Sequence, residues 1–144
     1  MQWRGVGSVN AVREAIRDGI QRLEDNLKQG PTIDPELLTS HHFAPGVYAR
    51  ALIIPKGSEL TGKIHKTEHL NIVAAGKIRV VSEEGAREVT APDIFVSMPG
   101  IKRAGHALEN TVWITIHVTD ETDLEKIEDE VIARDYSEIE GLLT

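Results

Sequence analysis

Apolar residues recur at helical spacing close to the N-terminus. Between residues 8 and 29, the apolar positions are separated by four, four, three and four residues, namely Val12, Ile16, Ile20, Leu23 and Leu27. This spacing places the five side chains on one side of a helix. We therefore predict a helix over residues 8–29. Its apolar stripe packs on the body of the protein or, because the spacing is nearly heptad, on a second subunit.

The middle of the chain has a pattern typical of short strands. From residue 46 to residue 119, Val, Ile and Thr gather in short runs that Gly and Pro turn signals separate. The candidate strands cover residues 47–54, 59–65, 69–75, 77–82, 88–90, 94–98, 103–108 and 111–119. About eight short strands at close spacing indicate a small β-barrel or jelly roll.

The last candidate strand alternates between apolar and mixed positions. Val112, Ile114, Ile116 and Val118 form one side, which we assign to the core. Trp113, Thr115 and His117 form the other side. That mixed side lines a cavity or lies under a terminal helix, and the alternation does not choose between them.

A second helix is predicted after the strands. Thr122 to Glu125 matches a capping box. Leu124, Ile127 and Val131 then form an apolar stripe on an otherwise acidic helix. We therefore expect a mainly β protein that forms one folded domain. It comprises a helix and connecting segment (1–45), a barrel (46–119) and an acidic helical tail (120–144).

Charge and composition restrict the class of protein. The net charge is −7, but residues 120–140 hold ten acidic and two basic residues, so the rest of the chain is nearly neutral. General nucleic-acid binding would need a basic patch, and we expect none.

The chain has no cysteine, which excludes disulfides and thiolate metal sites. No apolar run approaches the ~20 residues of a membrane span, and we expect a cytoplasmic protein, in the host cytoplasm if a phage encodes it.

Two histidines stand close together in a segment rich in polar side chains. The sequence from His65 to His69 matches H-x-x-E-H, a zinc-protease motif that requires a helix. The residues on either side of this motif have the composition of strands and turns and not of a helix, so we favour a pocket inside a barrel. Alternate residues of a strand face one side. Lys63, His65, His69 and Asn71 would therefore converge at one barrel mouth.

The stretch from Gly57 to His117 resembles the cupin superfamily. The first cupin motif runs Gly, five residues, His-x-His, three or four residues, Glu, six residues, Gly. With its ends on Gly57 and Gly76, its two histidine positions fall on Lys63 and His65 and its glutamate position on His69. In the second motif, Met98 takes the proline position and Arg103 the histidine position.

The resemblance implies a cupin-like barrel and two alternative sites. The four metal-ligand positions of the family become Lys63, His65, His69 and Arg103, two of which are cations. We therefore favour a pocket for an anionic or phosphorylated small molecule, formed by Lys63, His65, His69, Asn71, Arg103 and Trp113. The alternative is a metal-dependent isomerase, epimerase or oxygenase. It would hold zinc, iron, nickel or manganese on His65, His69 and His106, with Glu68 as acid or base and His117 available as a further nitrogen.

The resemblance also bears on partners and on biological role. Cupin-like proteins are commonly dimers, so we expect a homodimer or higher homo-oligomer. Parts of the sequence are similar to small uncharacterised cupin-like proteins of tailed phages, which favours a phage accessory role. A third interpretation is a structural or assembly protein whose barrel is a rigid spacer. Whether the protein is an enzyme stays open.

Overall fold

The computed structural model describes the backbone of residues 5–30 and 34–138, and side chains from residue 11 onward within those ranges. The helices are α1 (Gly5–Gln29), the 3-10 helix η1 (Pro35–Leu38) and α2 (Leu124–Val131). The strands are β1 (Thr39–Ala44), β2 (Val47–Ile54), β3 (Glu59–Thr61), β4 (Ile64–His65), β5 (His69–Ala75), β6 (Lys77–Ser82), β7 (Gly85–Thr90), β8 (Asp93–Ser97), β9 (Ala104–Ala107), β10 (Thr111–Val118) and β11 (Ile132–Ala133).

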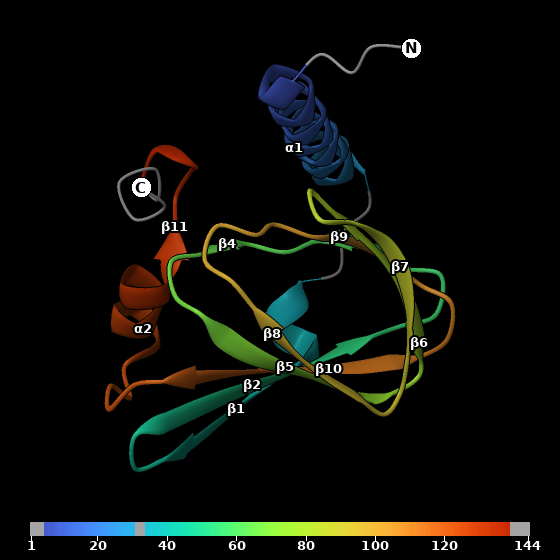
Figure 1. Cartoon of the computed structure of the whole chain (residues 1–144). Helices are drawn as coiled ribbons and strands as arrows, with labels where there is room; N and C mark the ends of the chain where they lie inside the picture. The colour runs from blue at the N-terminus through green and yellow to red at the C-terminus, as the bar shows by residue number, and fades with distance from the viewer. Residues whose placement is uncertain (1–4, 31–33, 139–144) are drawn as a thin grey trace.

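Antiparallel sheets enclose one apolar core. A five-stranded sheet has the order β1-β2-β10-β5-β8, and a four-stranded sheet has the order β3-β9-β6-β7. Ile54 and Val73 from the first sheet pack with Ile78, Val80, Val89 and Ala107 from the second. Figure 1 shows the two sheets wrapped around a common interior. The predicted mainly β, barrel-like fold is confirmed.

Helix α1 packs on the barrel through the C-terminal half of its stripe. Ile20 is buried, while Val12 is exposed. The helix contacts β3 and β6, and Figure 1 shows it at the opposite end of the molecule from β1 and β2. An ion pair between Arg17 Nε and Glu83 Oε2 at 2.8 Å also joins it to the barrel. The C-terminal half of the stripe therefore packs on the body of the protein, which is the first of its two predicted roles.

The sheet begins earlier in the chain than we predicted. Strand β1 lies in the segment expected to be a connection, and it pairs along its whole length with β2. A short turn joins the two strands at Gly46, whose φ of 77° suits glycine. Position 76 also requires glycine, because a Cβ there would lie 2.1 Å from the Asn110 carbonyl oxygen.

The assignment of the apolar side of β10 to the core is wrong, whereas its mixed side lines the cavity, which was one of the two alternatives left open for it. Val118, assigned to the core, is 88% exposed, whereas His117 is 5% exposed and Thr111 is fully buried. The mixed side of the strand therefore faces the interior. It can do so because the polar groups of this interior have partners among themselves, as described below.

The C-terminal segment closes one edge of the barrel. Helix α2 buries Ile127 and Val131 against Tyr48, as its stripe predicted. Its cap is Asp123, whose carboxylate accepts hydrogen bonds from the N–H groups of Glu125 and Lys126. After the helix, β11 pairs with β4 and so holds His65 in place. Among the described residues, no helix is long and apolar enough to cross a membrane.

Candidate functional site

A row of polar residues crosses the inner face of the five-stranded sheet. Cross-strand pairing places Arg50 of β2 beside Thr115 of β10, Thr115 beside Asn71 of β5, and Asn71 beside Phe95 of β8. Because side chains alternate along a strand, all four project to the same side. The three polar residues of this row, Arg50, Thr115 and Asn71, line a cavity between the two sheets.

The cavity has a volume of about 120 Å³. Its polar lining comes from β2, β4, β5, β10, the link between β3 and β4, and the residue that directly precedes β9, and its apolar lining comes from both sheets. The polar and aromatic residues that line it are Arg50, Lys63, His65, His69, Asn71, Arg103, Trp113 and Thr115.

Asn71 is the centre of a hydrogen-bond network in the cavity wall. Its side-chain amide donates to Ser97 Oγ at 2.7 Å, and its carbonyl oxygen accepts from Trp113 Nε1 at 3.0 Å. Ser97 Oγ also accepts from Arg103 Nη1 at 2.7 Å. Every member of this chain therefore has a partner, which makes a polar interior tolerable. The same contacts hold the Arg103 side chain in place.

Three imidazole rings gather at one end of the cavity. The ring centroids of His65 and His69 are 4.2 Å apart, and His117 lies 5.2 Å from the first and 5.0 Å from the second. His69 Nδ1–H donates to the carbonyl oxygen of Thr67 at 3.0 Å. His117 Nδ1 is buried and has no hydrogen-bond partner among the described residues.

The surroundings keep these histidines neutral. Burial, the other two histidines, Arg50 and Arg103 lower the pKa of His65 to about 2. Burial, His69 and Arg50 lower the pKa of His117 to about 4. The pKa of His69 is also lowered, chiefly by burial. Arg50 and Arg103 add to the effect of burial, because a nearby positive charge disfavours protonation of an imidazole.

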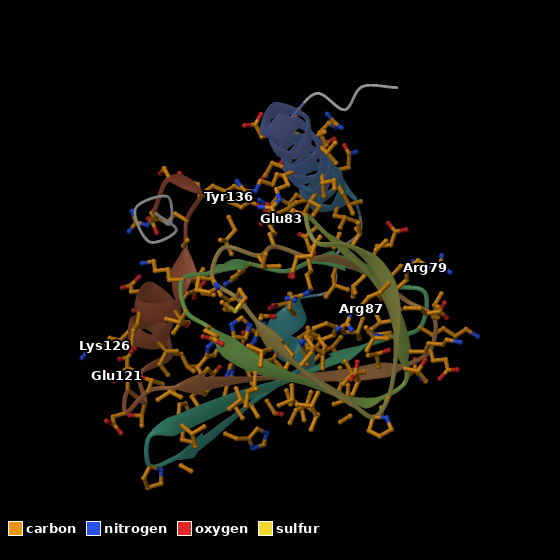
Figure 2. All side chains as sticks on the ribbon, viewed as in Figure 1. Arg79, Glu83, Arg87, Glu121, Lys126 and Tyr136 are labelled. Atoms are coloured by element: carbon orange, nitrogen blue, oxygen red, sulfur yellow. The ribbon has the colours of Figure 1, made fainter. Side chains whose placement is uncertain are left out.

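The cavity lining includes cations but no carboxylate. Arg50, Lys63 and Arg103 line it, and no Asp or Glu does so among the described residues. Arg50 forms no ion pair with a described residue, and Arg103 reaches Glu84 only at 3.9 Å, at the rim. Arg87 and Arg103 also lie over the Phe95 ring, at 4.6 and 5.3 Å from its centroid. In Figure 2, Arg87 lies toward the barrel interior and Arg79 points away from it.

All six residues predicted for the ligand site lie together. Lys63, His65, His69, Asn71, Arg103 and Trp113 all line this one cavity. Lys63 is at its edge, and its ammonium group pairs with Glu128. Glu68, the candidate acid or base, is exposed and does not line the cavity.

His106 does not join the other two histidines as the predicted metal set requires. It is the cross-strand partner of Arg79, and both lie on the outer surface of the four-stranded sheet. Its Nδ1 lies 3.6 Å from Glu59 Oε1. His117 takes the third position instead, because the mixed side of β10 faces inward.

Two residues that line the cavity, Arg50 and Thr115, were not predicted as site residues from the sequence. Arg50 and Thr115 sit in strands whose alternation did not say which side was inside. The pairing of β2 with β10 places them next to each other. Their role follows from that pairing and from no motif.

The three histidines do not fit a resident divalent metal in this arrangement. One ring nitrogen of His69 is already used, because its Nδ1–H donates to the Thr67 carbonyl oxygen. Among the described residues, no group of three His, Asp or Glu side chains is arranged to hold a metal ion. The nearby guanidinium groups would also repel such an ion.

Comparisons with known proteins support the fold and go no further. No protein-family profile matches the chain, and no curated protein matches it. Among solved structures, KdgF from a Halomonas species has a TM-score of 0.51 and 17% identity over 68% of this chain and 94% of its own. Protein NMB1881 from Neisseria meningitidis has a TM-score of 0.50 and 8% identity, over 62% of this chain and 100% of its own. The Cnp3 cupin domain of Schizosaccharomyces pombe has a TM-score of 0.49 and 18% identity, over 69% of this chain and 70% of its own.

The likeness to KdgF, a cupin-family protein, extends over nearly all of that protein. It agrees with two antiparallel sheets closed around one interior and with the motif spacing from Gly57 to Arg103. At this level of identity it shows the fold alone. The chain therefore has the cupin fold.

Proposed function

We propose that the protein binds a small anionic molecule in the cavity between its two sheets. The observation that carries this proposal is the charge of the lining: Arg50, Lys63 and Arg103 line the cavity, and no carboxylate among the described residues does. A buried positive charge without a counter-ion is costly. An anionic ligand would supply that counter-ion.

The chemistry of the lining indicates which anions would suit. A guanidinium group offers a planar fork of N–H donors that matches the oxygens of a carboxylate or a phosphate. Arg103 is already oriented by Ser97, so less conformational entropy is lost when it binds. Trp113 supplies an apolar wall. A carboxylate or phosphate ester with a short apolar body fits this combination.

The cellular location and the biological role of the protein are part of the same proposal. A cytoplasmic location, a phage accessory role and the absence of general nucleic-acid binding remain our predictions. The alternatives are a metal-dependent enzyme, which the arrangement of the three histidines does not favour, and a purely structural barrel. A structural barrel would not need a cation such as Arg50, which lines the cavity and forms no ion pair with a described residue.

The direct test is a titration with inorganic phosphate, succinate and citrate, followed by the NMR signals of the histidine rings. We expect saturable shifts of the His65, His69 and His117 signals with at least one of these anions. Arg50→Gln and Arg103→Gln should each weaken binding by about 10-fold or more, since a charge-assisted hydrogen bond contributes roughly 1.5–3 kcal/mol. Arg79→Gln, on the outer surface, is the matched control and should leave the affinity unchanged. Equal affinity in all three variants would contradict the proposal.

A second titration, with Zn²⁺ or Ni²⁺, separates the proposal from the metal-dependent alternative. We expect no stoichiometric binding at the three histidines. One equivalent of tightly bound metal that is lost in both His65→Ala and His117→Ala would instead establish a metal centre. That result would replace the anion site as the main function of the cavity.

A further inference from the structure

Arg87 of β7 projects toward the interior of the barrel. Its cross-strand partner is Val80 of β6, which belongs to the apolar core. Because directly opposed residues of an antiparallel pair project to the same side, Arg87 is on the inner face of the four-stranded sheet. Arg79, by contrast, is opposite Glu88 and projects outward. Figure 2 shows the same difference between the two arginines.

The Phe95 ring brings Arg87 together with Arg103. Strands β7 and β8 are edge strands of different sheets, and Arg87 of the first reaches over Phe95 of the second. The guanidinium carbon of Arg87 lies 4.6 Å from the ring centroid, and that of Arg103 lies 5.3 Å from it. Together, these distances limit the separation of the two guanidinium carbons to about 10 Å. Two cations are therefore held beside one ring, which attracts both.

Little negative charge balances these two guanidinium groups. Among the described residues, Arg87 forms no ion pair and Arg103 has only Glu84, whose Oε1 is 3.9 Å from Nη2 and whose side chain is 58% exposed. Burial lowers the pKa of Arg103, Glu84 raises it, and Arg87 lowers it further, because like charges repel. An anion bound between the two guanidinium groups would offset this repulsion.

Both side chains keep N–H donors for such an anion. A guanidinium group has five N–H donors. Arg103 Nη1 donates to Ser97 Oγ at 2.7 Å, and within the described part of the chain no other side-chain N–H of Arg103 or Arg87 has an acceptor. The contact with Ser97 also fixes Arg103 at the cavity, which it lines. The two arginines can therefore contact one ligand from the side of β7 and β8.

We propose that Arg87 and Arg103 together bind a phosphate group, so that the ligand of the cavity is a small phosphate ester. This inference rests on the proposed anion site and selects between the two classes of anion that suit it. A carboxylate is planar, and one guanidinium fork satisfies its two oxygens. A phosphate monoester has three free oxygens and a charge of about −1.5 to −2 at pH 7, so it can accept hydrogen bonds from two guanidinium groups. The rest of the ester would lie toward Asn71 and Trp113, and Arg87 would determine specificity.

The test compares a phosphate monoester with carboxylates, using the full chain at pH 7.5. Methyl phosphate, acetate and succinate are each titrated, and the NMR signals of the histidine rings report binding. We expect methyl phosphate to bind at least about 10-fold more tightly than acetate, since two guanidinium groups donate charge-assisted hydrogen bonds to it. Arg87→Gln should weaken the binding of methyl phosphate about 10-fold and that of acetate less than about twofold. Arg79→Gln, in the same sheet but on its outer face, is the matched control and should leave both affinities unchanged.

The outcomes separate this inference from the anion site on which it rests. If none of the three anions shifts the histidine signals, both are wrong. If the anions bind but Arg87→Gln leaves the affinity for methyl phosphate unchanged, or weakens succinate equally, the anion site stands and the phosphate assignment is wrong. Arg87 is exposed on an edge strand, so the variant should fold, which circular dichroism checks. Arg87→Lys is a second variant, and because it keeps a positive charge without the planar fork, it should weaken methyl phosphate binding less than Arg87→Gln.

Discussion

The two faces of the five-stranded sheet have opposite characters. The inner face includes Arg50, Asn71, Thr115 and His117, whereas the outer face at neighbouring positions is made of Ala, Val, Leu and Ile. In most half-buried sheets the apolar side faces the core and the polar side faces water. Here the polar side faces inward. The arrangement is tolerable because the inner polar groups have hydrogen-bond partners among themselves.

The inner face has an apolar end and a polar end, which the alternation of residues along one strand does not distinguish. The core beneath the sheet is still apolar at one end, where Ile54 and Val73 meet the second sheet. Toward the other end, a hydrogen-bonded network replaces it. A sheet can therefore enclose a polar ligand site at one end and an apolar core at the other.

The largest effect should come from shortening the same residue type on the two faces. Val73 is fully buried and Val118 is 88% exposed. Val73→Ala removes buried methyl groups and leaves a cavity, which should lower the free energy of unfolding by about 2–3 kcal/mol. Val118→Ala should change it by less than about 0.5 kcal/mol when measured at low protein concentration, where the monomer dominates. Urea unfolding measures both values. Equal losses would mean that the assignment of inside and outside is wrong.

The next effect should come from the inner polar network. Asn71→Ala leaves Trp113 Nε1–H without its acceptor and Ser97 without one of its donors. An unsatisfied buried polar group costs about 1–3 kcal/mol, so we expect a loss of about 2 kcal/mol. The Trp113 fluorescence should shift at the same time, which a general loss of stability in the folded state would not cause. Ser82→Ala, also at a buried polar position but outside the network, is the control for the fluorescence.

The smallest of these effects, taken per pH unit, should be a dependence of the free energy of unfolding on pH. The pKa values of His65 and His117 in the folded protein, about 2 and about 4, lie below the ordinary 6.5. As pH falls below about 6.5, the unfolded chain takes up protons that the folded chain does not, so the free energy of unfolding decreases. The contribution is complete above pH 6.5 and is lost progressively toward the folded-state pKa values.

Each additional proton on the unfolded chain corresponds to a slope of about 1.4 kcal/mol per pH unit. His65→Gln should reduce the slope between pH 4 and pH 6 by about that amount. His106→Gln, whose ring lies outside the cavity, is the matched control. Chemical denaturation at a series of pH values measures the slopes. The idea fails if the two variants have the same slope as the wild type.

Local patterns in the sequence were enough for most elements. The stripe from Ile16 to Leu27 predicted α1, and Leu124, Ile127 and Val131 predicted α2. The strands over 47–54, 69–75 and 77–82 were predicted with the observed bounds, since Gly and Pro mark their ends. Strand β1 was missed, because its residues Ser40 to Phe43 lack apolar alternation and its pairing with β2 is what makes it a strand.

The candidate site was predictable in part. Motif spacing brought Lys63, His65, His69 and Arg103 together, and the structure places all four on one cavity. Spacing also suggested His106 as the third histidine of a metal set, but that residue pairs with Arg79 on the outside. The side that a residue faces depends on the register between strands, which a single strand does not encode.

The sequence by itself determined both long helices, eight candidate strands where the described residues form eleven, the cupin-like spacing and the cluster of cations and histidines. These depend on residues near one another in the chain, whose periodicity and turn chemistry act locally. Only the tertiary structure decided that the polar side of β10 faces inward, that Arg50 lines the cavity with His117 packed against two of its histidines, and that an apolar sheet face is left outside. The physical reason is that alternation is symmetric with respect to the two faces of a strand. Only the pairing of distant strands and the network around Asn71 determine which face is enclosed.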